Sequence, residues 1–474
     1  MKKTGLFIFL FPLLITIVVP GSAGADWNYT FEPKVSVSQE YDSNIYFTEK
    51  NEEDDFNTQV GVLFPLKAKT EATDLALTYR TSYFNYSSES DADFGEHFAD
   101  LLINHALTRR LRVSLADYFS ITEDSDRVLR SDSDVGETGI LVDRDKRTGN
   151  RVTGTVSYAL TPRAAVSLSA NNSFYNYDFD DLYDSDTNGG SVTLNYNVSA
   201  QNSVFASVSY SKGDYERDDW TLNQNIRYGL DPLDNVISTF EDEFDESEYY
   251  SAYGGWTHHY SPTTTLSVYA GWRKTEDTEQ EVLLVANPGT DVLTPNTSRL
   301  PDNTIVTDVL SGETGEVLPA SPTVVTFRNT RLVTNENTET DRGLVYNLKF
   351  DKDFRSSKLS LAFSQDASTR SSGLGGTQQT QNYTAKYDHR LSSRLSGFVK
   401  GRYYRNEAED DLEDDYDTWG AGAGVRYAIT RHLSSRLTYD YTEQKIDRPG
   451  SRKSSTIDRN LLLLSFGYTW HVMR

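Results

Sequence analysis

The sequence predicts an all-β protein, an antiparallel up-and-down transmembrane β-barrel of about 18 strands. Three observations indicate this fold. Apolar and polar residues alternate with a period of two along most of the chain, as in Val192, Leu194, Tyr196 and Val198. Short polar turns recur between these segments. No segment beyond the N-terminus is apolar for long enough to form a membrane helix, so a chain that enters a membrane must close its strands into a barrel.

The first 25 residues predict a secretory signal peptide. Lys2 and Lys3 precede an apolar stretch at 6–19, and Ala23-Gly24-Ala25 supplies the small residues of a cleavage site. Cleavage after Ala25 leaves 26–474 as one barrel domain. A membrane anchor is the alternative, but the apolar stretch is shorter than the roughly 20 residues that a spanning helix needs.

Eight short polar turns set the expected number of strands. They lie at 69–72, 107–110, 160–163, 199–202, 260–263, 354–357, 391–394 and 429–432. Eight turns join nine units of two strands, and 2 × 9 gives 18 strands. The other connections are longer and acidic, for example 51–55, 125–146, 214–245 and 408–417. Short turns facing the periplasm and long extracellular loops are typical of bacterial outer-membrane barrels.

The connection at 275–336 is unusually long, and irregular loops of that length are uncommon unless they are functional. It would either fold into the lumen as a constriction or extend the barrel outward as a hairpin. A second segment, Asp184-Ser185-Asp186-Thr187-Asn188-Gly189, matches the first half of a calcium loop. Position twelve of that loop would be Asn195 instead of the bidentate Glu, so we expect a turn there and no metal site.

The composition excludes several classes of function. The chain has no cysteine and a net charge of −24, from 46 Lys+Arg against 70 Asp+Glu. Cysteine-based metal sites, disulfide scaffolds and cysteine nucleophiles are therefore absent, and nucleic acid is not an expected partner. The seven histidines show no metal-ligand spacing, and no Ser/His/Asp arrangement can be read from the sequence. We expect no cofactor and no enzymatic activity.

The last strand alternates apolar residues toward the lipid and then continues past its final aromatic residue, where such strands usually end. The lipid-facing residues expected here are Leu462, Leu464, Phe466, Tyr468 and Trp470. An aromatic closing strand of this kind is the segment by which the barrel assembly machinery recognises outer-membrane barrels. Aromatic residues near other strand ends, such as Trp27, Tyr83, Trp272 and Trp419, fit the two interfacial girdles of a barrel.

The opposite set of alternating positions gives the expected lumen. Its charged members are Lys67, Arg80, Arg112, Arg151, Arg273, Lys349, Lys386, Lys400, Arg402, Arg426 and Arg436. Its aromatic members are Tyr175, Tyr177, Tyr253, Tyr269, Phe398 and Tyr404. Acidic members are fewer, with Asp351, Asp388 and Asp440 the clear ones, so the wall is expected to be basic. Guanidinium groups bind carboxylates, and rings stack on the C–H faces of sugars. The alternative is that these charges only solvate a water-filled lumen and pair across strands.

Three segments resemble the second-type β-barrel porin family. They are FEPKVSVSQEYDSNI at 31–45, LALTYR at 75–80, and 107–118. The resemblance spans the mature chain but rests on diffuse motifs, with no catalytic signature to transfer. Members of this family often belong to exopolysaccharide systems, including those linked to exosortase. The resemblance thus implies polysaccharide export or another transport role in the envelope.

Together these features predict a bacterial outer-membrane, porin-like channel that passes saccharide, with exopolysaccharide export implied by the resemblance. A general diffusion porin and a structural or adhesive barrel without transport are the alternatives. The expected partners are outer-membrane lipid and lipopolysaccharide, the barrel assembly machinery, and periplasmic polysaccharide-export components.

Overall fold

The structure is a computed structural model. It describes residues 27–123, 146–178, 184–216, 236–286, 292–293, 326–327, 330–369, 377–408, 415–448, 454–470 and 472. The expected signal peptide, 1–25, lies outside this part of the chain. Among the residues described, no helix is both long and apolar enough to cross a membrane.

The described elements are strands and one short 3-10 helix. They are β1 (Asn28–Phe31), β2 (Lys34–Asp42), β3 (Asp55–Lys69), β4 (Thr73–Tyr86), η2 (Ser90–Ala92), β5 (Phe94–Ala106), β6 (Leu111–Thr122), β7 (Arg147–Ala159), β8 (Ala164–Tyr177), β9 (Asp184–Asn197), β10 (Asn202–Glu216), β11 (Val236–Ser261), β12 (Thr264–Ala286), β13 (Val292–Leu293), β14 (Thr326–Phe327), β15 (Thr330–Asp353), β16 (Ser357–Thr369), β17 (Thr377–Arg390), β18 (Leu395–Ala408), β19 (Asp415–Ala428), β20 (Leu433–Asp447) and β21 (Ser455–Thr469).

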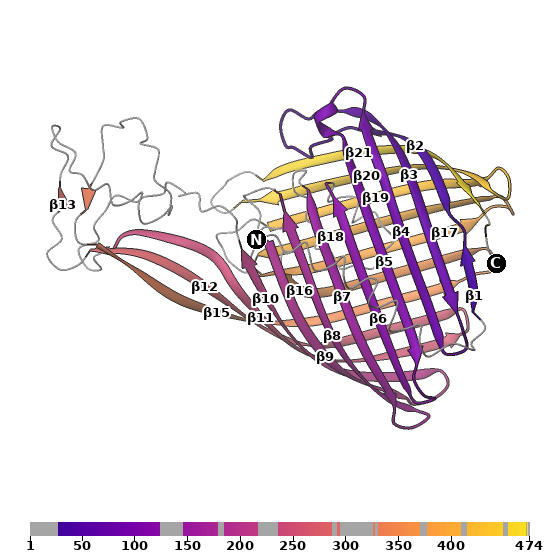
Figure 1. The fold of residues 1–474 in the computed structure, drawn as a ribbon, viewed down its shortest axis with the longest axis horizontal. Helices are drawn as coiled ribbons and strands as arrows, with labels where there is room; N and C mark the ends of the chain where they lie inside the picture. The colour runs from indigo at the N-terminus through magenta and orange to yellow at the C-terminus, as the bar shows by residue number, and fades with distance from the viewer. Residues whose placement is uncertain are drawn as a thin grey trace.

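The strands form one closed antiparallel barrel (Figure 1). Each strand from β2 to β12 and from β15 to β21 pairs with its neighbour in chain order, which gives 11 + 7 = 18 strands. The barrel closes where β2 pairs with β21, with Val35 opposite Tyr468 and Tyr41 opposite Leu462. The predicted all-β, antiparallel fold of about 18 strands is confirmed.

The short strand β1 continues β2 along the same neighbour, β3. Phe31 lies opposite Leu66 and Lys34 opposite Leu63, so the pairing register does not change between the two strands. Pro33 interrupts the ladder because proline has no N–H to donate. Its carbonyl still accepts a hydrogen bond from the N–H of Trp470 at 2.9 Å, which continues the β2–β21 pairing past the end of β21.

Seven of the eight predicted turns share one local geometry. A Ser or Thr hydroxyl accepts hydrogen bonds from backbone N–H groups two or three residues further on, which stabilises a tight turn. Thr108 Oγ1, for example, accepts from the N–H of Arg110 at 3.2 Å and of Leu111 at 3.0 Å. The same hydroxyl is supplied by Thr70, Thr161, Ser199, Ser261, Ser392 and Thr430. We call this end of the barrel the turn end and the opposite end the loop end.

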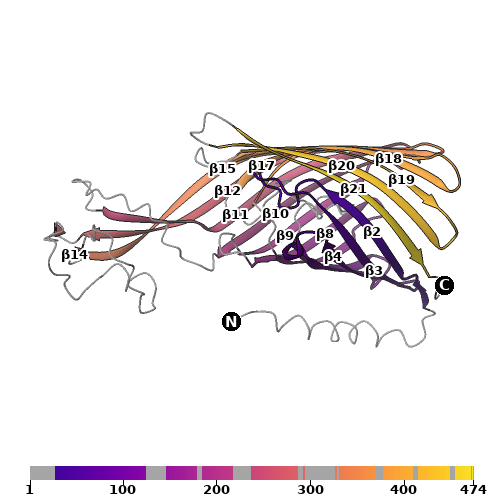
Figure 2. The same cartoon turned by 90° about the horizontal axis from the view of Figure 1, so that it is seen from above.

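Three strands extend beyond the barrel at the loop end. β11, β12 and β15 run to the left of the other barrel strands in Figure 1, and Figure 2 shows the same extension from above. β12 pairs with β15 without interruption from Thr264 opposite Lys352 to Ala286 opposite Thr330. The described residues of 275–336 next to the barrel are therefore strands of an outward hairpin. β11 begins at Val236, inside the connection that the sequence analysis placed at 214–245.

The segment Asp184–Gly189 is also a strand, and the expected turn there is wrong. It forms the first part of β9, with Asp186 opposite Phe174 on β8 and opposite Asp214 on β10. Cross-strand pairing on both sides overrides the turn preference of Asp, Asn and Gly. Within the described chain no group of three or more potential ligands is placed to hold a metal ion.

Candidate functional site

The outer face of the barrel carries the large apolar side chains. Leu462, Leu464, Phe466, Tyr468 and Trp470 are each between 40% and 46% exposed to the surroundings of the barrel. Residues directly opposite each other in antiparallel strands point to the same side of the sheet. Following the cross-strand pairs from β21 around the barrel brings most exposed apolar strand residues onto this face. Examples are Leu194, Leu348 and Val399. Leu102 on β5 and Tyr118 on β6, in contrast, lie on the opposite face.

A row of aromatic rings crosses this outer face toward the loop end. Tyr346, Phe363, Tyr383, Tyr403 and Trp419 contact one another in sequence, with ring centroids 5.2, 4.4, 5.7 and 4.0 Å apart. The Tyr403 hydroxyl donates to Asp417 Oδ1 at 2.7 Å. Such rings combine an apolar body with a polar tip, the combination found where a barrel meets the membrane interface.

All seventeen residues proposed for the lumen occupy positions of the opposite, inner face. The charged ones are Lys67, Arg80, Arg112, Arg151, Arg273, Lys349, Lys386, Lys400, Arg402, Arg426 and Arg436. The aromatic ones are Tyr175, Tyr177, Tyr253, Tyr269, Phe398 and Tyr404. Much of the remaining inner face is Ser, Thr, Asn and Gly, for example Ser167, Ser169 and Asn171 on β8. Small polar side chains of this kind suit a wall in contact with water.

The inner face also carries more acids than the sequence analysis recognised. Besides Asp351, Asp388 and Asp440, the register places Glu40, Asp42, Glu96, Asp100 and Asp341 there. Asp341 pairs with Arg273 at 3.1 Å, so part of the basic charge is neutralised across strands. The inner face is therefore expected to be less basic than the sequence pattern suggests. Basic residues are most concentrated in one section.

Strands β17 to β20 form the most basic section, which we call the basic wall. Its inner residues include Lys386, Lys400, Arg402, Arg426 and Arg436. Lys386 lies directly opposite Lys400, and Arg426 directly opposite Arg436. Like charges directly opposite each other destabilise a sheet. A negatively charged group held between them would relieve that repulsion.

Three glycines of β19 let long side chains of β18 lie flat on the basic wall. A Cβ at Gly422 would lie 2.6 Å from Lys400 Cε and 2.2 Å from Asp440 Oδ1. Lys400 Nζ therefore reaches Asp440 Oδ1 on β20, at 2.9 Å, across the bare glycine backbone.

The neighbouring side chains repeat this arrangement on either side. Arg402 crosses Gly420 and donates from Nη2 to Thr442 Oγ1 at 3.1 Å. Phe398 covers Gly424, with the Arg436 guanidinium 5.2 Å from its ring centroid. These side chains therefore extend across neighbouring strands along the wall.

Replacing Gly422 with leucine should narrow the interior. The new side chain would displace both Lys400 and Asp440 from the wall, because neither has room to remain above residue 422. We expect the single-channel conductance of Gly422→Leu to fall well below the wild-type value. A matched control is Gly154→Leu, since a Cβ at Gly154 on the outer face meets nothing within 4 Å. Equal conductance in the two variants would contradict this placement of Lys400.

An aromatic cluster lies on the inner face of β10 to β12. Tyr253 and Tyr269 have ring centroids 5.3 Å apart. Phe205, which the sequence analysis missed, contacts both rings edge-on at 6.1 and 6.3 Å. Gly255 and Gly271 lie beneath these rings, where a Cβ would come within 2.3 Å of ring or backbone atoms. The alternation of β10 places Phe205 on this face, and the glycines in register with it are the sequence signal that could have identified the cluster.

Further aromatic and basic groups pair around the inner face. The Arg80 guanidinium lies 4.1 Å from the centroid of the Phe98 ring, and Arg147 lies 5.3 Å from that of Tyr175. Arg151 Nη2 donates to the Tyr175 hydroxyl at 3.2 Å. Tyr175 covers Gly149, as Lys400 covers Gly422. Cation–π and hydrogen-bond contacts thus fix the orientation of several inner side chains.

The connection between β2 and β3, residues 43–54, packs against the inner face at the loop end. Ile45 is fully buried against Phe84 and Phe94 of β4 and β5. Phe47 packs against Ile446 and Ile457 of β20 and β21, at a backbone φ of 53°. A non-glycine residue in that region is strained, so the packing must hold it there. Among the described residues, the connection at 43–54 therefore packs inward, whereas the described part of 275–336 next to the barrel forms an outward hairpin.

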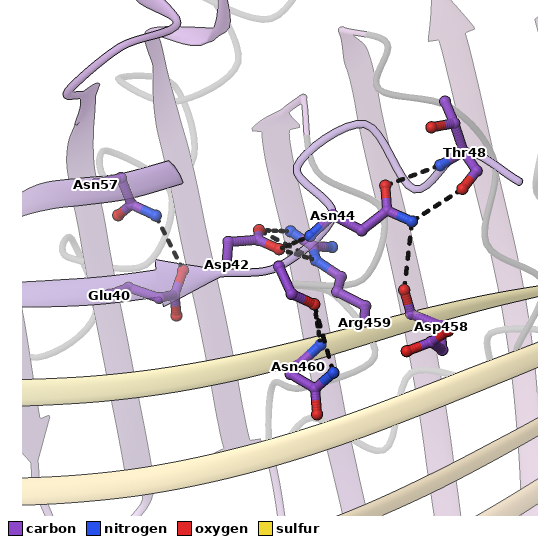
Figure 3. Close-up of polar contacts among 9 residues, drawn as sticks. Glu40, Asp42, Asn44, Thr48, Asn57, Asp458, Arg459 and Asn460 are labelled. Atoms are coloured by element: carbon purple, nitrogen blue, oxygen red, sulfur yellow. Dashed lines mark hydrogen bonds and ion pairs between the residues drawn. The ribbon is translucent and has the colours of Figure 1, made fainter. Parts of the chain in front are cut away.

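Polar contacts anchor this connection to the barrel seam (Figure 3). The side-chain amide of Asn44, fully buried, donates to the carbonyls of Thr48 at 2.9 Å and Asp458 at 3.3 Å. Asp42 accepts from Arg459 Nε at 2.9 and 3.1 Å and also from Nη2, and the Asp42 side chain has no exposure. This ion pair joins the first strand of the barrel to the last.

Comparisons with known proteins find no matching family model and no matching curated protein. Among solved structures, the chain is similar to Pseudomonas aeruginosa OccK2 (OpdF), crystallised in complex with glucuronate. The TM-score is 0.41 at 9% identity, covering 95% of this chain and 99% of that one. It is also similar to outer membrane protein opdK of Pseudomonas aeruginosa, with a TM-score of 0.39, 10% identity, and 93% and 99% coverage. A third similar structure is Acinetobacter baumannii OccAB4, with a TM-score of 0.38 at 9% identity, covering 93% of this chain and 98% of that one. At these values no residue of those proteins is carried over to this chain.

Proposed function

We propose that this protein is a channel of the bacterial outer membrane that passes anionic saccharides. The outer face offers lipid a belt of exposed apolar residues and aromatic rows, and the inner face is rich in hydroxyl and amide groups. In this setting the turn end faces the periplasm and the loop end faces the outside.

The observation that carries this proposal is the pairing of like charges on the basic wall. Lys386 opposite Lys400 and Arg426 opposite Arg436 place four cations on this wall, one pair on β17 and β18 and the other on β19 and β20. Asp440 neutralises Lys400, whereas within the described chain no acid forms an ion pair with Arg426. Carboxylates and other anions are the natural complement of such a surface, since guanidinium groups bind them with two parallel hydrogen bonds.

The aromatic cluster of Phe205, Tyr253 and Tyr269 supplies the second element, a surface for sugar rings. A polymer that has to pass through needs several weak contacts instead of one tight site, because a tight site would prevent release. Rings that stand on three different strands of the inner face meet that requirement.

Exopolysaccharide export is the specific role that we propose for the channel. It rests on the resemblance of 31–45, 75–80 and 107–118 to the second-type β-barrel porin family. The same proposal includes periplasmic polysaccharide-export components as partners. Lipopolysaccharide would surround the barrel in the outer leaflet, and the closing strand β21 would engage the barrel assembly machinery.

Removing the aromatic surface should reduce saccharide passage but not ion passage. We expect Tyr253→Ala with Tyr269→Ala to slow permeation of galacturonate oligomers into liposomes several-fold. The chloride conductance should fall by less than about twofold, because small ions do not depend on ring stacking. Liposome swelling and planar-bilayer recordings on the same preparation measure the two quantities.

The matched control removes two tyrosines of the outer face, Tyr383→Ala with Tyr387→Ala. These should leave both quantities unchanged, provided the variant inserts. Equal loss of saccharide and chloride passage in the inner variant would show that the rings only maintain the pore. In cells, unchanged surface polysaccharide after deletion of the gene would refute export and leave a diffusion porin as the better account.

A further inference from the structure

We propose that the turn end holds an entry site for an anionic saccharide chain, formed by Arg163 with the amide of Asn197 and by the arginines of neighbouring turns. The inference rests on the proposed function and adds to it the first point of contact and the side from which the chain enters. Three observations support it: a cavity, the direction of the arginines, and the absence of acid partners.

The cavity opens beside the turn between β9 and β10. It has a volume of about 350 Å³ and is lined by Arg163, Asn197, Ser199, Asn202, Ser203 and His259, with Ala200. The side chain of Asn202 turns to the outer face, where its Oδ1 accepts from Trp256 Nε1 at 3.1 Å and its Nδ2 donates to Ser199 Oγ at 2.9 Å. The inward groups that line the hollow are Arg163, Asn197, Ser203 and His259. An arginine, an amide and a hydroxyl on one hollow provide donors for a carboxylate and for sugar hydroxyls.

Backbone pairing sets the direction of the arginines. The carbonyl of Arg163 accepts from the N–H of Asn197, that of Arg110 from Ala159, and that of Arg394 from Ala428, each at 2.8 Å. These bonds extend the strand ladders by one residue beyond Leu111, Ala164 and Leu395. Those three strand residues point outward, so the alternation directs Arg110, Arg163 and Arg394 inward.

Three other arginines also lie in short turns at the turn end but occupy a different position within the turn. Arg109, Arg355 and Arg431 lie at the tips of their turns, outside the ladders. All six side chains are exposed. In the part of the chain that the structure describes, none of the six forms an ion pair. Arg273, Lys400 and Arg459, further along the interior, each pair with an acid.

These differences give the interior an axial polarity. Arginines free to bind anions gather at the mouth of the turn end, where the inner acids Asp351 and Asp388 also lie, while Glu40, Asp42 and Glu96 lie toward the loop end. A charged mouth raises the local concentration of an oppositely charged ligand and its rate of entry, by tenfold or more at low salt. It does not by itself drive net transport. It favours entry from the periplasmic side.

The test compares two triple variants that change the same net charge in the same kind of turn. Arg110→Gln, Arg163→Gln and Arg394→Gln form the inward set, and Arg109→Gln, Arg355→Gln and Arg431→Gln form the tip set. Galacturonate oligomers are added to one side of single channels in planar bilayers of neutral lipid, and the rate of current block is recorded. Because the chain has no cysteine, Glu52→Cys labelled with an impermeant thiol reagent in every protein reports the orientation.

Wild-type channels should be blocked faster from the turn end than from the loop end. The inward set should lower the turn-end rate about tenfold and remove the asymmetry, and the tip set should retain at least half the wild-type rate. Neutral dextran oligomers should show no difference among the three proteins. The entry site would be refuted if the wild-type channel were blocked at equal rates from both sides, or if the inward set and the tip set lowered the turn-end rate equally.

A lipid role gives a different result. If the turn arginines bind anionic phospholipid instead, block would be unchanged in both sets, and both would bind vesicles containing phosphatidylglycerol less well than the wild type does. That outcome also refutes the entry site. Failure of the proposed function is separate, because a wild-type protein that passes no ions would reveal it before any oligomer is added.

Discussion

Replacing Arg459 with methionine should lower the free energy of unfolding by about 3–5 kcal/mol, among the largest effects expected for a single substitution in this chain. The guanidinium is 3% exposed and the Asp42 carboxylate not at all, and the two form a bidentate pair. Without Arg459, Asp42 is a buried charge with no cation beside it. The pair also joins β2 to β21, so its loss weakens the strand pairing that closes the barrel.

Urea titration of the barrel folded in lipid vesicles measures this change. The double variant Asp42→Leu with Arg459→Met should recover much of the stability, because it removes both charges. An exposed pair provides the control. Lys445→Gln, which breaks a contact with Asp447 where both side chains are over 40% exposed, should cost less than about 1 kcal/mol. Similar losses of unfolding free energy for Arg459→Met and Lys445→Gln would mean that the Asp42–Arg459 pair is hydrated in the folded barrel.

Replacing Leu464 with arginine should destabilise the folded barrel by about 2–4 kcal/mol if the residue lies near the membrane midplane. Leu464 is on the outer face of the closing strand, between Leu462 and Phe466, and is 43% exposed to the surroundings of the barrel. An arginine there must either enter lipid or bend toward an interface, and both cost free energy.

The same arginine on the inner face should be nearly neutral. Asn195 on β9 is exposed and lies on the opposite face from its neighbour Leu194, so Asn195→Arg adds a charge in contact with water. Folding of the two variants into vesicles, followed by resistance to unfolding in urea, gives the comparison. A Leu464→Arg protein as stable as Asn195→Arg would mean that the two faces are assigned the wrong way round.

The barrel itself could be predicted from local sequence because its pattern is local. A period of two in β9, together with turn residues such as Thr161 and Ser392 at fixed positions, is enough to define strand, turn and face. Strand pairs in an up-and-down barrel are neighbours in the sequence. The order of the strands therefore follows once the turns are known.

The parts that the sequence analysis missed depend on contacts between distant residues. The inward packing of Ile45 and Phe47 requires partners on β4, β5, β20 and β21, which are far away in the chain. The same reason applies to Asp42 with Arg459, 417 residues apart. Glycine is unfavourable within a strand, so the sequence alone gives no reason for Gly420, Gly422 and Gly424. The reason is that side chains of the neighbouring strand β18 lie across them.

The number of acids on the inner face was underestimated for a similar reason. Asp100 lies opposite Tyr118, and Asp341 is in register with Thr275 on a strand longer than a membrane requires. Asp341 lies just outside the apolar alternation that begins at Leu344, so the sequence pattern gives it no face. In β11, β12 and β15 polar sequence beyond the apolar alternation continues as paired strands.

Single-channel recording on the wild-type protein in a planar bilayer tests the central claim most directly. Under a salt gradient we expect stepwise currents and a reversal potential whose sign shows selectivity for anions, despite the net charge of −24. Screening confines the influence of the acidic loops to about 10 Å at 0.1 M salt, whereas Arg426, Arg436 and Lys386 lie on the inner wall itself. Absence of current would show that the interior is closed, and cation selectivity would show that the basic wall does not govern passage. Either result would contradict a channel for anionic saccharides.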